Sequence, residues 1–220
     1  MKYRSVFDII GPVMIGPSSS HTAGAARIGL VARQLFRDQP EKVSFHLYGS
    51  FAKTYQGHGT DVALIGGILG FDTSDPRLTN AVEEAQKNEL AFEFIIENEV
   101  SHHPNTVKIV MEKNGRSMSL MGISIGGGKV EIKELNGFEL NLSGNHPAIL
   151  VVHEDKYGAI ASVAAVLAGK KINIGHMEVS RKEEGKDALM VIEVDQNVEQ
   201  ETLEEISALD HITQVTKVHE

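Results

Sequence analysis

The sequence has 220 residues, of which 41% are hydrophobic and 23% charged, so it is long enough for one large or two modest soluble domains. Its formal net charge of −9 argues against non-specific binding to nucleic acid or to anionic membranes. Cysteine is absent, which excludes a disulfide and a cysteine-ligated zinc or iron–sulfur site within this chain.

No apolar run is long enough to span a bilayer, and the first residues lack the apolar stretch and cleavage site of a signal peptide. We therefore expect a cytoplasmic protein without a membrane segment. The segment 5–10 is predicted to form one helical turn, because Ser5 can cap it and Asp8 follows three residues later.

Residues 11–27 read GPVMIGPSSSHTAGAAR and precede an apolar helical pattern that predicts a helix from about Thr22 to Arg37. A run of serine and threonine before such a pattern is typical of a helix N-cap. The unpaired N–H groups and dipole of the helix start favour a carboxylate or a phosphate there. His21 adds a group that titrates near neutral pH. The alternative is a serine-rich cap with a surface histidine.

A half-buried strand is expected over Val43–Tyr48, followed by a second glycine-rich segment that contains Gly57-His58-Gly59. We expect Thr60 to cap a second helix, so this segment repeats the order of glycine loop, histidine, hydroxyl and apolar helix. Two such helix starts in one domain would face one ligand from both sides. The competing interpretation is a histidine that only hydrogen-bonds its own loop.

Further along, Thr79 is expected to cap a helix that runs to about Leu90, and Phe92–Ile96 is expected to form a strand. The loop SHHPNT at 101–106 has two adjacent histidines but no third ligand at a fixed spacing, so we expect no metal there. Asn105 and Thr106 are the more useful donors for a small polar ligand.

The clearest hairpin pairs 107–113 with 117–125 through Asn114-Gly115, a dipeptide that favours a type I′ turn. Gly126–Gly128 is expected to form a turn before a strand at 130–135. It does not resemble a phosphate loop, since neither the GKS/GKT sequence nor a helix follows it.

The polar segment 142–147 is the expected domain boundary, which gives domains 1–143 and 147–220. The second domain follows the order β-α-β-β-α-β of a ferredoxin-like unit. Helices then cover one face of its sheet, so the other face or an edge is expected to pair with a second copy. The expected strands are 148–153, 172–181, 188–194 and 211–218, with helices around 160–167 and 203–209.

This second domain resembles an ACT domain through LVVHEDKYG, where Tyr157-Gly158 enters the helix, and through VLAGKKINI, where residues 172–174 leave it. ACT domains usually bind amino acids between paired copies, near the first strand–helix turn. The resemblance therefore implies an effector site that includes Asp155, Gly158, Asn173 and Ile174. Many ACT modules only dimerise, so binding and pure dimerisation both stay open.

The first domain contains GPSSSHTAGAARIG, YGSFAKTYQGHGTD and HPNTV, which together resemble the β subunit of bacterial iron–sulfur-dependent L-serine dehydratases. The resemblance extends over essentially the whole chain. It implies an α+β fold: an N-terminal α/β domain similar to the allosteric substrate-binding domain of some phosphoglycerate dehydrogenases, and a C-terminal ACT domain. In that family the α portion carries the cysteines of a [4Fe–4S] cluster, and the absence of cysteine here fits the form with separate subunits.

The resemblance implies conversion of L-serine to pyruvate and ammonia, together with a cysteine-containing α subunit. His21 is the expected catalytic group of this chain, as the base for the Cα proton or as a proton donor to the leaving oxygen. The substrate carboxylate is expected at Ser18, Ser19, Ser20 and Thr22, with His58, Thr60, Asn105 and Thr106 as the pocket wall.

Two other functions stay open on the sequence. One is a non-catalytic binding subunit that senses serine and docks on a partner. The other is a free-standing ACT regulator without a catalytic partner. In each case we expect a homodimer or a higher assembly through the ACT sheets.

Overall fold

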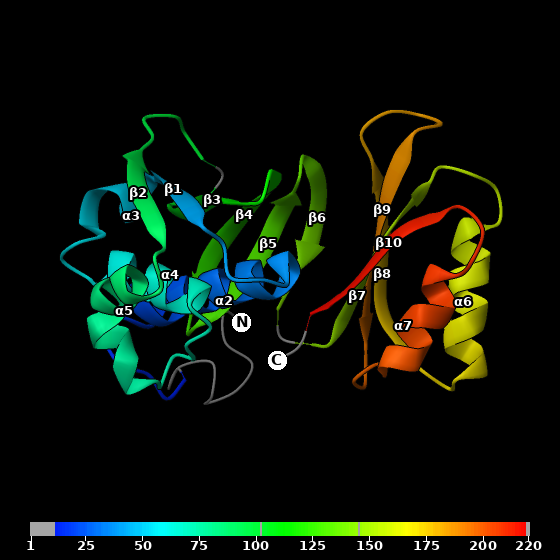
Figure 1. The fold of residues 1–220 in the computed structure, drawn as a ribbon, viewed down its shortest axis with the longest axis horizontal. Coiled ribbons are helices and arrows are strands. Elements are labelled where there is room, and N and C mark those ends of the chain that lie inside the picture. Colours follow the sequence, from blue (N-terminus) through cyan, green and yellow to red (C-terminus); the bar gives the residue numbers. More distant parts are fainter. Residues whose placement is uncertain (1–11, 102, 145, 219–220) are drawn as a thin grey trace, which may run out of the picture. The chain divides into compact units, whose positions relative to one another are not determined.

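The computed structural model describes residues 12–101, 103–144 and 146–218 (Figure 1). The chain divides into two compact units, 1–133 and 134–220. A mixed α/β architecture with a six-stranded and a four-stranded sheet agrees with the expected fold class. The helical turn expected at 5–10 lies outside the described residues.

The larger sheet has the strand order β2-β1-β3-β4-β5-β6. β1 and β2 run parallel, whereas β3 lies antiparallel to both β1 and β4. Alternate side chains of β1, including Phe45, are fully buried and form the core face of this sheet. The strands are β1 (Lys42–Tyr48), β2 (Ala91–Ile96), β3 (Asn105–Lys113), β4 (Arg116–Gly126), β5 (Lys129–Leu135) and β6 (Phe138–Leu142).

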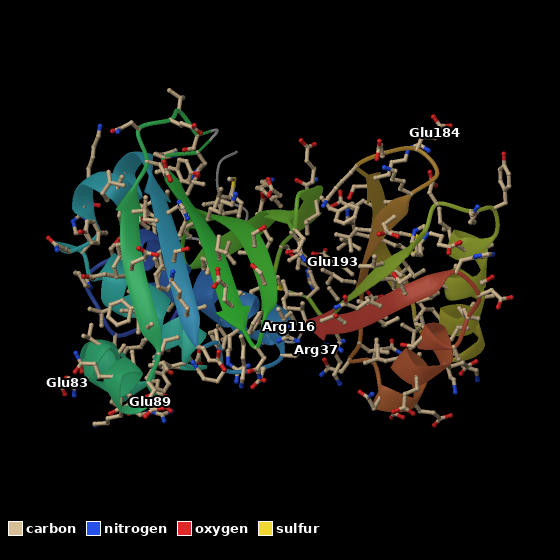
Figure 2. The ribbon with its side chains drawn as sticks, turned by 45° about the horizontal axis from the view of Figure 1, so that its top comes forward. Arg37, Glu83, Glu89, Arg116, Glu184 and Glu193 are labelled. Carbon is tan, nitrogen blue, oxygen red and sulfur yellow. The ribbon has the colours of Figure 1, made fainter. Side chains whose placement is uncertain are left out.

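The hairpin predicted at Asn114-Gly115 is confirmed. Both residues have positive φ, 49° and 75°, and Lys113 pairs with Arg116. Arg116 also donates to the carbonyl of Phe36 at the end of α2 (Gly24–Phe36) and is one of the residues labelled in Figure 2.

A second Asn-Gly turn was missed by the sequence analysis. Asn136 and Gly137 have φ values of 50° and 80° and separate β5 from the unpredicted strand β6. The dipeptide carries the same turn signal as the first hairpin. FELNL alternates apolar and polar residues as a strand does, but the expected boundary segment 142–147 takes in its last residue.

The helix after the serine run begins earlier than expected, as a π-helical turn over Ser19–Ala23 that continues into α2. Ser18 is the N-cap, and its side chain accepts from the His21 backbone N–H. The hydroxyl cap was therefore predicted correctly, but Thr22 lies inside the helix rather than at its first position.

Two other predicted caps were wrong. α4 (Thr60–Ile68) is preceded by Gly59 in the left-handed conformation, so Thr60 is the first helical residue and not the cap. Thr79 lies within a 3₁₀ turn over Pro76–Asn80 that Asp75 caps, and α5 (Ala81–Lys87) follows. The short helix α3 (Gly49–Thr54) was not predicted at all.

Glycines explain how α2 and α4 pack together. A Cβ built on Gly67 would lie 2.2 Å from the carbonyl oxygen of Ala26, and one on Gly29 would lie 2.6 Å from that of Leu64. Only a residue without a side chain allows the two backbones to approach this closely. The close approach at Gly29 and Gly67 therefore determines how α2 packs against α4.

From residue 148 on, the second unit has the predicted β-α-β-β-α-β order, with the antiparallel strand order β10-β7-β9-β8. Both helices lie on the same side of this sheet (Figure 1), where Val163 and Ile206 join its buried core. β8 starts at residue 174 rather than at 172. The elements are β7 (Ala148–Glu154), α6 (Ala159–Gly169), β8 (Ile174–Arg181), β9 (Asp187–Val194), α7 (Gln200–Ser207) and β10 (Ile212–Val218).

The segment in which we placed the domain boundary is held to β9. The backbone N–H and the hydroxyl of Ser143 donate to the carboxylate of Glu193, at 2.9 and 2.7 Å. Glu193 is labelled on β9 in Figure 2. Both partners lie in the second unit, so this contact joins the segment before β7 to β9 within that unit.

Candidate functional site

The His21 imidazole is held by serine hydroxyls on both of its nitrogens. Nδ1 lies 3.0 Å from Oγ of Ser20 and 3.5 Å from Oγ of Ser18, and Nε2 lies 2.9 Å from Oγ of Ser50. The ring also makes edge contacts with Phe51 and His58, at centroid distances of 5.5 and 4.9 Å. The ring is half-buried, and these contacts hold its orientation.

Burial lowers the pKa of the His21 imidazole, and the nearby His58 lowers it further. A neutral imidazole therefore predominates at neutral pH. It carries one N–H and one lone pair, so it can accept a proton from a substrate.

Ser50 reaches His21 from the junction of β1 and α3. Gly49 has a φ of 55°, and a Cβ at that position would lie 2.6 Å from the carbonyl oxygen of Pro104. The backbone N–H of Ser50 donates to the same Pro104 oxygen at 2.6 Å. Sequence analysis gave Ser50 no role. Its signal was its place in GSFAKT, one of the segments that carry the family resemblance.

The segment before α4 is hydrogen-bonded to the π-helical turn Ser19–Ala23. The buried Thr22 hydroxyl donates to the carbonyl of His58 at 2.9 Å. His58 is itself exposed and packs against His21. Thr60 is fully buried, and its Oγ1 has no hydrogen-bond partner within the described part of the chain. The structure thus brings both predicted histidines together, and both threonines are buried.

Asn105 and Thr106 differ in what they offer to a ligand. Asn105 is half-buried, pairs with Gly49 across the sheet end and donates from Nδ2 to the carbonyl of Ser124 at 3.3 Å. Thr106 is buried, and its hydroxyl donates to the carbonyl of His103 at 2.6 Å. Asn105 therefore stands beside the Ser50 segment, whereas the Thr106 hydroxyl stabilises the turn before β3.

A second residue missed by the sequence analysis is Ser124 on β4. Its Oγ is buried and lacks a hydrogen-bond partner among the residues described. A Cβ on Gly24 would lie 2.0 Å from this atom, so Ser124 packs directly against the first turn of α2. Ser19 is half-exposed in the π-helical turn just before it. The roles of all these residues in substrate binding stay predictions.

The residues present do not suit a metal centre. Across 12–101, 103–144 and 146–218, no three histidine, aspartate or glutamate side chains gather as ligands. Nδ1 of His103 accepts the backbone N–H of Asn105 at 3.1 Å, so this nitrogen serves the loop. Without cysteine, the chain has no ligand of the type that holds an iron–sulfur cluster.

The four residues of the expected ACT effector site do not meet in one chain. Asp155 and Gly158 precede α6, whereas Asn173 and Ile174 follow this 11-residue helix. The backbone N–H of Gly185 and Nη1 of Arg181 both donate to Asp155 and hold its pKa below the ordinary value. Nδ2 of Asn173 donates to Asp195 at 2.6 Å. Each polar group therefore already has a partner.

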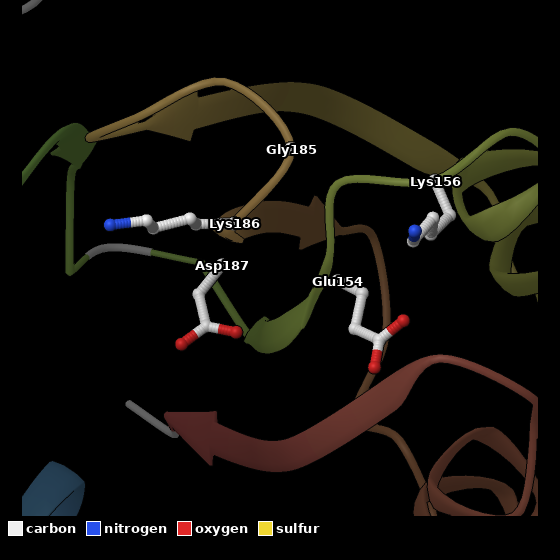
Figure 3. A pocket seen from close by; sticks show the side chains of 5 residues that line it. All are labelled: Glu154, Lys156, Gly185, Lys186 and Asp187. Atoms are coloured by element: carbon white, nitrogen blue, oxygen red, sulfur yellow. The ribbon is translucent and has the colours of Figure 1, made fainter.

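A surface hollow lies next to the Asp155–Gly185 contact. Its volume is about 410 Å³, and Figure 3 shows its lining, with the two lysine side chains leaving in different directions. Charges of both signs suit a zwitterion, but the hollow is wide open to solvent. The lining residues are Glu154, Lys156, Gly185, Lys186 and Asp187.

Among the described helices, none has the length and apolar character needed to cross a bilayer.

Comparison with known proteins identifies the family. The model of the family described as "Serine dehydratase beta chain" matches residues 5–134, and that of the ACT domain matches 148–211. The "Probable L-serine dehydratase, beta chain" of Bacillus subtilis (strain 168) is 64% identical, covering 99% of both chains. The "L-serine dehydratase, beta chain" of Peptoniphilus asaccharolyticus is 37% identical, covering 95% of both.

Similarity extends to a different enzyme. The D-3-phosphoglycerate dehydrogenase of Bacillus subtilis (strain 168) is 25% identical over 87% of this chain, which corresponds to 36% of that enzyme. Full-length coverage, by contrast, is found with the two dehydratase β chains. The chain therefore belongs to the serine dehydratase beta chain family and carries an ACT domain after the family-defining region.

Proposed function

We propose that this chain is the β subunit of an L-serine dehydratase that converts L-serine to pyruvate and ammonia together with a separate, cysteine-containing α subunit. The names of its full-length relatives support the substrate and the subunit role. The observation that carries the chemistry is the half-buried His21 imidazole, which serine hydroxyls orient at the start of a helix.

The start of this helix is the proposed site for the serine carboxylate. The first amides of a helix have no partner within it, and its dipole favours an anion. The hydroxyls of Ser18 and Ser20 lie at the same place, and the amide of Asn105 stands at the neighbouring sheet end. A carboxylate bound there would bring the Cα of serine close to His21.

His21 is the proposed base for the Cα proton. A lowered pKa keeps the imidazole neutral at the pH of the reaction, which a base requires. Once the Cα proton is removed, loss of the β-hydroxyl as hydroxide gives aminoacrylate, which hydrolyses to pyruvate and ammonia. His58, in contact with the His21 ring, is the proposed neighbour on the pocket wall.

The expected [4Fe–4S] cluster does not fit the donor set of this chain, because the chain has no cysteine. We therefore assign the cluster to the α subunit. The β chain's contribution is then to bind the carboxylate and to accept the proton.

The subunit proposal is tested by co-expression with the cysteine-containing partner. We expect pyruvate from L-serine when both chains are present and none from the isolated β chain. Turnover by the isolated β chain, or failure to co-purify with such a partner, would contradict the proposal. If Ser19→Ala changes only the cooperativity toward serine and leaves turnover at saturating serine intact, the site is a sensor rather than part of the catalytic centre.

A further inference from the structure

The serine hydroxyls around His21 differ in the hydrogen bonds that they can still donate or accept. Oγ of Ser18 already accepts the backbone N–H of His21 at 3.1 Å, and it lies 3.4 Å from Oγ of Ser20. Ser20 and Ser18 both face Nδ1, whereas among the residues that the structure describes Ser50 alone is within hydrogen-bond distance of Nε2. The two ring nitrogens therefore have unequal surroundings.

This inequality favours one tautomer. An N–H at Nδ1 can be shared between two oxygen acceptors, at 3.0 and 3.5 Å, whereas a lone pair there would use only one hydroxyl hydrogen. A proton on Nδ1 leaves a lone pair on Nε2, which needs a donor. The Ser50 hydroxyl, 2.9 Å away, is the donor in place.

We propose that Ser50 is a positioning residue whose hydroxyl donates to Nε2 of His21 and so holds the ring in the tautomer that carries its proton on Nδ1. The lone pair on Nε2 is then the one that accepts a proton. Its catalytic meaning rests on the function proposed above, but the tautomer itself does not.

The backbone around Ser50 is built to keep its hydroxyl in place. Its N–H donates to the carbonyl of Pro104 at 2.6 Å, and its carbonyl accepts from the Thr54 hydroxyl at 2.8 Å. The next residue, Phe51, is fully buried and contacts the His21 ring. Ser50 is thus fixed from both sides while its Oγ faces the imidazole.

The first test measures the tautomer in the unmodified full chain. Histidine is labelled with ¹⁵N, and long-range ¹H–¹⁵N correlations are recorded above the pKa of His21. The His21 signals are assigned by their loss in His21→Gln. We expect a protonated, pyrrole-type Nδ1 and an unprotonated, pyridine-type Nε2. The reverse pattern, or an average of the two tautomers, would overturn the proposal.

The second test uses the sign of the change in the His21 pKa. Ser50→Ala removes a donor to the neutral ring and admits water, so the pKa should rise. Ser20→Ala removes an acceptor of the Nδ1 proton, so the pKa should fall. Ser50→Thr keeps a hydroxyl and should keep the wild-type value. The opposite pair of signs would show that Ser50 accepts from Nε2–H, against the proposal.

His58 is the titratable side chain that contacts the His21 ring and acts on its charge. The same signs must therefore persist when each variant is made in a His58→Gln background. If an alanine variant does not fold, as judged by its amide spectrum, the tautomer of the unmodified chain still decides the matter. A confirmed tautomer with full turnover by His21→Ala would refute the proposed role of His21 as the base and leave this inference standing.

Discussion

In the first unit, polar side chains from three segments (the serines before His21, Ser50 and His58) meet around His21, whereas in the second unit the expected ligand residues stand at opposite ends of α6. The side chains of the first arrangement meet within one chain. Those of the second do not, and Asp155 and Asn173 already have partners of their own. This difference is consistent with our proposal that the first unit contributes to catalysis, and an ACT site that uses all four expected residues would need groups from a second copy.

The strongest test of this difference between the units removes a hydrogen-bond donor from the first unit. Asn105→Ala takes away an amide that we place on the pocket wall. Hydrogen bonds to charged groups contribute about 1.5–3 kcal/mol, so kcat/KM of the reconstituted enzyme should fall roughly 10- to 100-fold. Asn88→Ala, at an exposed helix end of the same unit, should leave kcat/KM unchanged. Equal behaviour of the two variants would remove Asn105 from the site.

The stability of the fold can be tested at two glycines, one at the contact between α2 and α4 and one in the second unit. Gly67→Ala places a methyl group 2.2 Å from the Ala26 carbonyl oxygen, so the backbones must separate, at a cost of about 1–3 kcal/mol of unfolding free energy. Gly169→Ala in the second unit meets nothing within 4 Å and should stabilise by about 0.4–1 kcal/mol. Urea unfolding measures both. A stable Gly67→Ala variant would show that the helix crossing is looser than described.

Each of the two buried threonines near His58 can be replaced by valine, which has nearly the same shape but no hydroxyl. Thr22→Val leaves the His58 carbonyl without its donor and should cost about 0.5–1.5 kcal/mol. Thr60→Val removes a hydroxyl that has no partner in the described chain, so the isolated chain should lose less stability than with Thr22→Val or even gain some. Thermal unfolding of the isolated chain compares them. A larger loss for Thr60→Val would reveal a partner for its hydroxyl.

The smallest expected effect is the pH dependence of stability. The folded-state pKa of His21 lies below the unfolded value of 6.5. As the pH falls below 6.5, the unfolded chain binds this proton first, so stability decreases until the folded pKa is reached. Above that window the residue contributes no pH dependence. In His21→Gln this part of the loss should disappear, and an unchanged stability–pH curve would contradict the shift.

Local patterns in the sequence were enough for several elements. The Asn114-Gly115 hairpin and the β-α-β-β-α-β order of the second unit followed from alternation and turn residues, since both signals are local. The serine run predicted the helix start that carries His21 for the same reason. The Asn136-Gly137 turn and the alternating residues after it carry the same local signals, but the expected boundary segment 142–147 overlaps the end of that strand.

Other parts of the site depend on contacts between distant segments. Ser50 and His21 are 29 residues apart, and α3 has only six residues and no apolar period. The unpartnered hydroxyl of Ser124 reaches Gly24 only because β4 packs beneath α2. Thr60 was taken for a cap because hydroxyls usually cap helices, but Gly59 supplies the left-handed turn instead. Local sequence patterns do not predict these arrangements.

The most direct measurement is the turnover of saturating L-serine by the α subunit combined with β chains that lack one histidine. For His21→Ala we predict a fall in kcat of about 10²- to 10⁴-fold, because a positioned acid–base group contributes that much. His176→Ala, on an exposed strand position of the second unit, should match the wild type. Wild-type kcat for the His21→Ala enzyme would contradict the assignment of the proton transfer to this chain.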